Sequence, residues 1–226
     1  MRRLLLVFFL FGISFSMRGQ DYPDAGSWNT FNLDLDLGSG FTGLFTQECR
    51  FDENISRLNL FYTNLGAEYK IAKPLKTALV YRFIEKYQKD NTFSFRHRLM
   101  LDISFKEKFG RFSFSYRHRL QAEKRDIYSS NKGPVAEWFS RSKFSLKYDT
   151  EKRYTPYTAV ELRYQIFDPR SQESNRTWHR IRYELGMDYK INNNNEVGLY
   201  YLIQYEFNVV TPQSIYIVGL EYNLSL

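Results

Sequence analysis

Residues 93–105 read Phe-Ser-Phe-Arg-His-Arg-Leu-Met-Leu-Asp-Ile-Ser-Phe, and this stretch decides the fold class. Every odd position is apolar or aromatic except His97, whereas the even positions carry mostly serine, arginine and aspartate. Residues 111–123 restart the same two-residue alternation. Successive side chains of a strand point to opposite faces, so each segment has an apolar face and a charged face. Both segments are longer than the usual strand of about 5–6 residues, and about 9–11 tilted residues suffice to cross a bilayer. The pattern predicts a transmembrane β-barrel with lipid outside and charge inside.

The amino terminus has the layout of a secretory signal peptide. Two arginines precede the apolar run LLLVFFLFGI, and small and polar residues follow it. This run is too short for a spanning helix, which needs about 20 residues. Cleavage after Ser16 satisfies the small-residue rule together with Ser14, whereas cleavage after Gly19 would expose Gln20 and Asp21. We expect residues 1–19 to be a cleaved signal peptide and residues 20–226 to form a single barrel domain in the outer membrane of a Gram-negative bacterium.

The composition is compatible with such a barrel. The mean hydropathy is −0.51, and barrel strands give a weak hydropathy signal because only half of their residues face lipid. Aromatic residues make up 18% of the chain, and barrels use aromatic girdles at both membrane interfaces. Removing residues 1–19 takes away three arginines and no acidic residue, so the net charge falls from +7 to +4. That small excess, interspersed with acids, argues against nucleic acid as a partner.

Segments with two-residue periodicity follow one another without a break in composition. We expect strands at 28–37, 41–50, 58–70, 76–86, 92–106, 111–123, 138–148, 156–167, 177–190, 196–207 and 214–225. Tight connections alternate with longer ones, and bacterial barrels have short periplasmic turns and longer extracellular loops. The tight set is therefore assigned to the periplasm.

The eleven expected segments leave two alternatives, because single-chain bacterial barrels have an even number of strands. Either residues 20–27 hold a twelfth strand, which Pro23 disfavours, or residues 28–37 are not a full wall strand and ten strands close the barrel. The sequence predicts an all-β transmembrane antiparallel β-barrel of 10–12 strands, with twelve favoured.

If the apolar faces point to lipid, the charged faces fill the lumen. The expected lumen charge network consists of Arg82, Arg96, Arg98, Arg117, Arg119, Arg163, Arg180, Arg182, Asp102, Glu123, Glu161, Glu184 and Glu206. The turn EKFG predicts a register with Arg98 roughly opposite Arg119, and the turn INNNN pairs Arg180 with Glu206. Like charges directly opposite are destabilising, so carboxylates must neutralise the arginines.

The network has two interpretations. In the first, arginine–carboxylate pairs plug a small barrel, since buried charges need partners. In the second, the arginines form a selectivity surface for an anionic solute. A rough balance of acids and bases in the sequence favours the plug.

Three histidines, His97, His118 and His179, recur in the settings FRHRL, YRHRL and WHRIR. Alternation places all three on the apolar face, away from the lumen acids, and interfacial packing is the preferred interpretation. The alternative is a lipid hydrolase, because outer-membrane phospholipases carry a serine–histidine pair on the outside of a barrel. Catalysis needs a nucleophile within reach of the base, and Ser140 or Ser142 could approach His118. The sequence contains no phosphate loop, metal-ligand spacing or nucleotide fingerprint, so we expect no cofactor and no metal.

Several segments together resemble a known family. They are GSW (26–28), QECRF (47–51), YRF (81–83), FRHRL (95–99), YRHRLQ (116–121), PYTAVELRY (156–164), RIRYELGMDYKI (180–191) and GLYYLIQYE (198–206). The chain resembles domain-of-unknown-function family 2490, bacterial envelope proteins common in Bacteroidetes, over about residues 26–226. The resemblance implies an outer-membrane β-barrel and supplies no activity or ligand. The family's recurring arginines fall on Arg50, Arg82, Arg98, Arg117, Arg119, Arg163 and Arg182.

The sequence thus predicts a small outer-membrane barrel that is structural or porin-like, with a charged lumen. The expected partners are outer-membrane lipid, the insertion machinery during biogenesis, and a small-molecule or anionic solute. A hydrolase with an outward-facing histidine site is the alternative.

Overall fold

The chain forms eleven β-strands in a computed structural model that describes residues 24–88, 90, 92–125, 135–169, 176–209 and 211–226. The expected signal peptide lies outside the described residues. The strands are β1 (Asp24–Gly38), β2 (Phe41–Asp52), β3 (Arg57–Lys70), β4 (Leu75–Tyr87), β5 (Phe93–Phe109), β6 (Phe112–Arg125), β7 (Glu137–Tyr148), β8 (Tyr154–Phe167), β9 (Thr177–Lys190), β10 (Asn195–Glu206) and β11 (Ser214–Ser225). The described part of the chain holds no helix long and apolar enough to cross a membrane.

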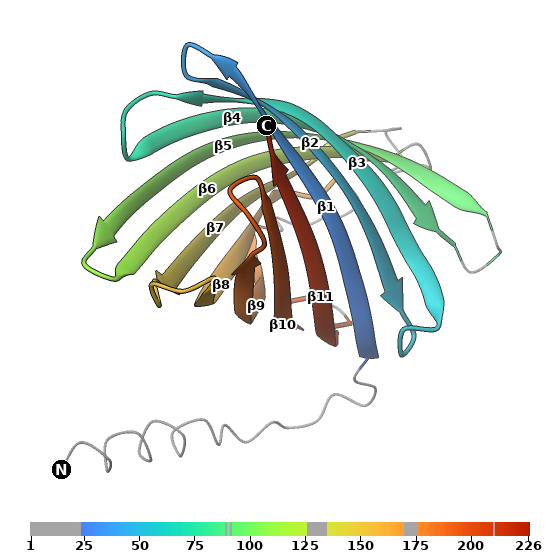
Figure 1. The fold of residues 1–226 in the computed structure, drawn as a ribbon. Helices are drawn as coiled ribbons and strands as arrows, with labels where there is room; N and C mark the ends of the chain where they lie inside the picture. The colour runs from blue at the N-terminus through green and yellow to red at the C-terminus, as the bar shows by residue number, and fades with distance from the viewer. Residues whose placement is uncertain (1–23, 89, 91, 126–134, 170–175, 210) are drawn as a thin grey trace.

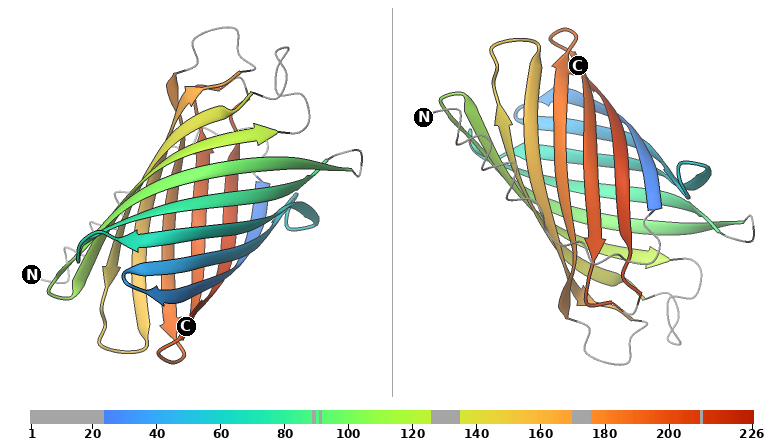
Figure 2. Two further views of the ribbon diagram at one scale, coloured as in Figure 1. Left: turned by 90° about the horizontal axis from the view of Figure 1, so that it is seen from above. Right: turned by 90° about the horizontal axis from the view of Figure 1, so that it is seen from below.

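All eleven strands close into one barrel, as Figures 1 and 2 show. Neighbours in sequence pair antiparallel, whereas β1 and β11 run parallel, from Asp24 opposite Ile215 to Asp34 opposite Ser225. An odd strand number forces this arrangement, because the first and last strands of an up-and-down barrel then point the same way. The all-β barrel is confirmed, with eleven strands within the expected 10–12 and one below the favoured twelve. Residues 24–27 are the first residues of β1 rather than a strand of their own.

The parallel seam places the two ends of the barrel wall at opposite mouths. β1 begins beside the connection after β2, where the Ile55 amide donates to the Ala25 carbonyl (3.1 Å). β11 ends beside the turn after β9, where the Ser225 amide donates to the Asn194 carbonyl (2.8 Å). We call these ends the long-loop mouth and the short-turn mouth, since the longest connections, 126–136 and 168–176, leave the first of them.

The β5–β6 register differs from the expected one. Arg98 lies opposite Glu123, and Arg119 lies opposite Asp102, so the expected Arg98–Arg119 juxtaposition is wrong. The reason is the turn: β5 continues through the residues read as a loop, and the tight turn is centred on Gly110, whose φ is +58°. Two-residue hairpin turns favour such left-handed positions, which glycine adopts without strain. Moving the turn two residues along the chain moves every partner by four.

The outside of the barrel is apolar at mid-strand. Leu65, Leu79, Leu99, Leu185 and Leu199 project from five strands, and each is 51% or more exposed. Monomeric soluble proteins rarely present contiguous apolar patches above a few hundred Å². A face of this kind is an unfavourable surface in water and a favourable one in hydrocarbon.

The inside is not uniformly polar. Tyr157, Tyr200, Leu202 and Ile217 form one buried apolar cluster on β8, β10 and β11. The Tyr200 ring lies across Gly219, its partner on β11, where any side chain would overlap the ring. Glycine there makes room for an aromatic side chain within a narrow barrel. These groups fill part of the interior and leave a cavity beside them.

Candidate functional site

A cavity of about 330 Å³ occupies the middle of the barrel. Ten basic side chains and four carboxylates line it. They are Arg50, Arg82, Arg98, Arg117, Arg119, Arg141, Lys143, Arg163, Arg180 and Arg182, with Glu48, Glu161, Glu184 and Glu221. Strand alternation brings them together, because every second residue of each strand points into the barrel. The central cavity is therefore basic rather than balanced.

One group of arginines is held tightly by carboxylates. Arg119 donates from Nε to Asp102 Oδ1 (2.7 Å) and from a second nitrogen to Oδ2 (2.6 Å), a bidentate pair between β6 and β5. Arg98 donates from two nitrogens to one oxygen of Glu123, Oε2, and the other oxygen of that carboxylate accepts from Arg96 (3.3 Å). Planar forks of this kind fix both the distance and the orientation of the guanidinium.

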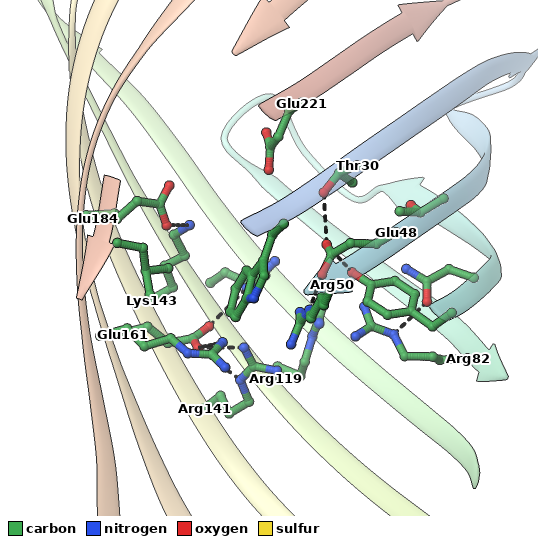
Figure 3. A pocket seen from close by; sticks show the side chains of 18 of the residues that line it. Thr30, Glu48, Arg50, Arg82, Arg119, Arg141, Lys143, Glu161, Glu184 and Glu221 are labelled. Atoms are coloured by element: carbon green, nitrogen blue, oxygen red, sulfur yellow. Dashed lines mark hydrogen bonds and ion pairs between the residues drawn. The ribbon is translucent and has the colours of Figure 1, made fainter. Parts of the chain in front are cut away.

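Glu161 on β8 is shared by three arginines. Its carboxylate lies 2.5 Å from Arg141, 3.2 Å from Arg182 and 3.3 Å from Arg117. Figure 3 shows Arg119 and Arg141 beside this carboxylate in the cavity wall. One carboxylate carries one negative charge, so the three guanidinium groups around it keep a net positive charge at this wall.

The carboxylates of the central cavity come from β2, β8, β9 and β11. Glu48 on β2 accepts from the Thr30 hydroxyl (2.9 Å) and the Tyr62 hydroxyl (2.6 Å), and it pairs with Arg50. Glu184 accepts from Lys143 (2.8 Å). Glu221 lines the same cavity from β11, and Figure 3 shows it on a different side from the arginine cluster. In contrast, β4–β7 contribute six basic side chains to the lining of the central cavity and no carboxylate.

A second cavity, of about 480 Å³, opens toward the long-loop mouth, and we call it the vestibule. It shares six lining residues with the central cavity: Trp28, Arg50, Arg98, Arg163, Arg180 and Arg182. The boundary between the two cavities is therefore a ring of five arginines and one tryptophan. The Arg50 guanidinium lies 3.6 Å from the centre of the Trp28 ring, a cation–π contact. Arg180 pairs with Glu206, its partner across β9 and β10.

Two interior arginines have no carboxylate within ion-pair distance among the described residues. Arg82 donates from Nε to Asn64 Oδ1 (2.7 Å) and stacks 3.5 Å above the Tyr62 ring. Arg163 lies 4.7 Å from the centre of the Phe139 ring, and its Nε is buried with no hydrogen-bond partner in the described part of the chain. Buried charges normally have partners, so these two side chains are exceptional within the wall.

His179 is not on the outer face, and that expectation is wrong. The β8–β9 register shifts after Arg163, which faces Arg180, so that Tyr164 faces Trp178. His179 is the extra residue of this β-bulge, and a bulge turns a side chain to the other face. It is 3% exposed and lines the vestibule, whereas Trp178 stays outside at 47%.

The residues of the expected charge network all lie inside the barrel wall. Arg82, Arg98, Arg117, Arg119, Arg163, Arg180, Arg182, Glu161 and Glu184 line the central cavity, Arg96, Glu123 and Glu206 line the vestibule, and Asp102 is buried against Arg119. Sequence reasoning missed Arg141 and Lys143. Their signal was present, because they alternate with the apolar Phe144 and Leu146 on β7.

A polar cluster lies on the outer face of β6 and β7. His118 Nδ1 lies 3.2 Å from Ser142 Oγ, and His118 Nε2 lies 3.4 Å from Ser140 Oγ. The Tyr116 hydroxyl is 3.3 Å from Ser142 Oγ. His97, the other outward histidine, contacts the Tyr81 hydroxyl (2.6 Å) from its Nδ1. The described residues contain no group of histidine, cysteine and carboxylate side chains arranged to hold a metal ion.

The match of a family model agrees with the resemblance drawn from the sequence. The family model described as "Protein of unknown function (DUF2490)" matches residues 25–214. No curated protein matches the sequence. A solved structure titled "NanC porin structure in rhombohedral crystal form" is 12% identical with a TM-score of 0.48, and the match covers 90% of this chain and 99% of that chain.

Proposed function

Because the chain belongs to the DUF2490 family of proteins of unknown function, we propose its role from the barrel itself: an outer-membrane β-barrel that passes small anionic solutes. The location rests on the outer face. Leucines at mid-strand are 51–67% exposed on β3, β4, β5, β9 and β10, and a closed barrel with an apolar outer band is one of the two structures that satisfy every backbone group in lipid. The expected signal peptide supports export. Outer-membrane lipid and the insertion machinery would then be its partners.

Fractionation of a Gram-negative host tests the location. The mature protein should be recovered with the outer membrane and should migrate faster in an electrophoretic gel before heating than after it, because the barrel stays closed in detergent. Recovery as a soluble periplasmic protein without detergent would reject the membrane assignment.

Topology gives a second test of this proposal. With the short turns in the periplasm, the parallel β1–β11 seam puts the start of β1 at the cell surface and the end of β11 in the periplasm. An epitope inserted just before Asp24 should bind antibody on intact cells. The same epitope after Leu226 should bind only after the outer membrane is opened. Equal exposure of the two epitopes would contradict the seam.

The preference for anions rests on the central cavity, where ten basic side chains face four carboxylates. Rings of arginine and lysine are the device by which pores favour anions. In a planar bilayer with a potassium chloride gradient, the reversal potential of the purified protein should have the sign of chloride permeation. Arg117→Gln combined with Arg141→Gln should move it toward the cation side. A cation-selective pore would reject the preference, and absence of any conductance would favour the plugged, structural barrel.

A second candidate function has one specific observation behind it, the contacts of His118 with two serines. The β6–β7 register sets His118 opposite Ser142 and one step from Ser140, with ring-to-hydroxyl distances of 3.2 and 3.4 Å. Ser140 Oγ would attack an acyl carbonyl of a lipid, and His118 Nε2 would take its proton. Ser142 would orient the ring through Nδ1. The products are an acyl-serine and the lysolipid, and water then releases the fatty acid.

A fluorogenic phospholipid in mixed micelles tests this activity. If the candidate is correct, Ser140→Ala and His118→Gln abolish hydrolysis. His97→Gln serves as the matched control, because that histidine also faces lipid and its Nδ1 contacts the Tyr81 hydroxyl (2.6 Å). Hydrolysis that survives Ser140→Ala, or its absence from the wild-type protein, rejects the hydrolase.

A further inference from the structure

Two buried nitrogen atoms at the inner end of the vestibule, which we call its floor, have no hydrogen-bond partner in the described structure. They are Nε of Arg163 and Nδ1 of His179. Both pack against one ring, since the Arg163 guanidinium lies 4.7 Å from the centre of the Phe139 ring and the centre of the His179 ring lies 5.6 Å from it. Both residues line the vestibule. Buried polar atoms in native structures are nearly always paired with protein, water or an ion, and an exception calls for an explanation.

Arg163 differs from the other arginines that have a buried Nε without a hydrogen bond. Arg96, Arg117 and Arg125 share that feature, but each is within ion-pair distance of a carboxylate. Arg163 instead faces Arg180 across the strand pair. Like charges opposite each other are destabilising, so a negative group is missing at this point of the wall.

The carboxylates of the vestibule do not supply that group. Glu123 is held by Arg96 and Arg98, Glu137 by Arg125, Glu206 by Arg180 and Asp52 by Arg57. Asp168 also lines the vestibule, but its carboxylate is not within ion-pair distance of Arg163. The vestibule, at about 480 Å³, has room for a solute of more than ten heavy atoms, since a water molecule takes up about 30 Å³ in the liquid.

We propose that Arg163 and His179 form an oxyanion-binding subsite on the vestibule floor, which takes the carboxylate or phosphate group of a small solute before it passes the arginine ring. This inference rests on the proposed function and names its substrate class. Arg163 supplies a planar guanidinium fork, which matches the geometry of carboxylate and phosphate oxygens. His179 supplies a ring nitrogen, and the bulge in β9 is what turns that nitrogen inward. Both groups pack against the Phe139 ring.

Histidine NMR provides the direct test, because the chain has three histidines and two of them face lipid. Detergent-folded protein with ¹⁵N-labelled imidazoles is titrated with inorganic phosphate, with acetate and with chloride, each at constant pH and ionic strength. The His179 ring resonances should move and saturate with phosphate, acetate or both, and the outcome identifies the group. The resonances of His97 and His118 should stay in place.

Two variants assign the effect to the subsite. Arg163→Gln should weaken the apparent affinity at least tenfold, and Arg163→Lys, which keeps the charge but loses the fork, should weaken it less. Arg57→Gln is the matched control, because Arg57 lies at the same mouth but pairs with Asp52 and Glu53, and it should bind as the wild type does.

The inference is overturned if chloride moves His179 as much as the oxyanions do, if no anion moves it, or if all three histidines move together. The reversal potential separates this failure from a failure of the proposed function. If the pore is anion-selective but His179 does not respond, the proposed channel function stands and the subsite is rejected. If His179 responds but the protein shows no conductance, the subsite stands and the proposed channel function is rejected.

Discussion

Arg119 and Arg163 line the same cavity, yet they are held in opposite ways. Arg119 makes a bidentate pair with Asp102, with side-chain exposures of 11% and 9%. Arg163 has an aromatic ring on one side and Arg180 across the strand pair, and no carboxylate of the described residues lies within ion-pair distance of it. A paired arginine contributes to the wall, whereas an arginine without a counter-charge raises the energy of the empty barrel and is available to an incoming anion. The difference separates the part of the charge network that stabilises the barrel from the part that can serve transport.

The largest expected effect on stability is at the paired arginine, Arg119. Arg119→Glu sets a carboxylate against Asp102, and disrupting a buried pair from one side typically costs about 3–5 kcal/mol. We expect loss of the folded, fast-migrating band or a large drop in the urea midpoint in detergent. The register expected from the sequence, with Arg98 opposite Arg119, would instead predict that Arg119→Glu is tolerated, because it would replace an Arg–Arg contact by an Arg–Glu pair.

The swapped pair controls for that prediction. Arg119→Asp together with Asp102→Arg keeps the same two charges across β5 and β6, so it should recover part of the lost stability. An Arg119→Glu protein as stable as the wild type would mean that the pair does not form.

A smaller difference in stability should distinguish Arg180 from Arg163, two arginines that face each other across β8 and β9. Arg180→Gln leaves Glu206 unpaired, and an unsatisfied buried group costs about 1–3 kcal/mol. Arg163→Gln removes a charge that has no counter-charge in the described structure, so stability should stay unchanged or rise. Measured in the same detergent, the urea midpoint of Arg180→Gln should therefore fall, whereas that of Arg163→Gln should not. A shift of both midpoints to lower urea would remove the distinction between paired and unpaired arginines.

The smallest effect is expected at the short-turn mouth, where Lys108 pairs with Asp149 (2.8 Å) and both side chains are exposed. The hydrogen bond from Lys108 lowers the pKa of Asp149 below its ordinary value. A lowered carboxyl pKa contributes stability above the unfolded-state pKa, and that contribution is lost as the pH falls through the folded-state pKa. Exposed pairs contribute little, so Asp149→Asn should change the urea midpoint barely at pH 7 and not at all well below that pKa. A difference that grows on acidification would contradict this assignment.

The sequence by itself determined the barrel and the faces of its strands. A strict two-residue period assigns each side chain to one face, and the length of the segments separates a membrane wall from a soluble sheet. Arg98, Arg119 and Glu161 could therefore be placed inside from the sequence alone. The pairing of Arg180 with Glu206 followed as well, because the INNNN turn fixes the β9–β10 register.

Only the tertiary structure decided which charges meet and how the barrel closes. The partner of Arg98 depends on where the turn at Gly110 falls, and a shift of two residues replaces Arg119 by Glu123. His179 faces inward because a bulge interrupts the alternation, and an irregularity of one residue leaves no periodic signal. The parallel seam between β1 and β11 joins residues almost two hundred positions apart, as in the Asn32–Asn223 hydrogen bond. The sequence pattern says which way a side chain faces, whereas its neighbour across the barrel depends on closure of the whole sheet.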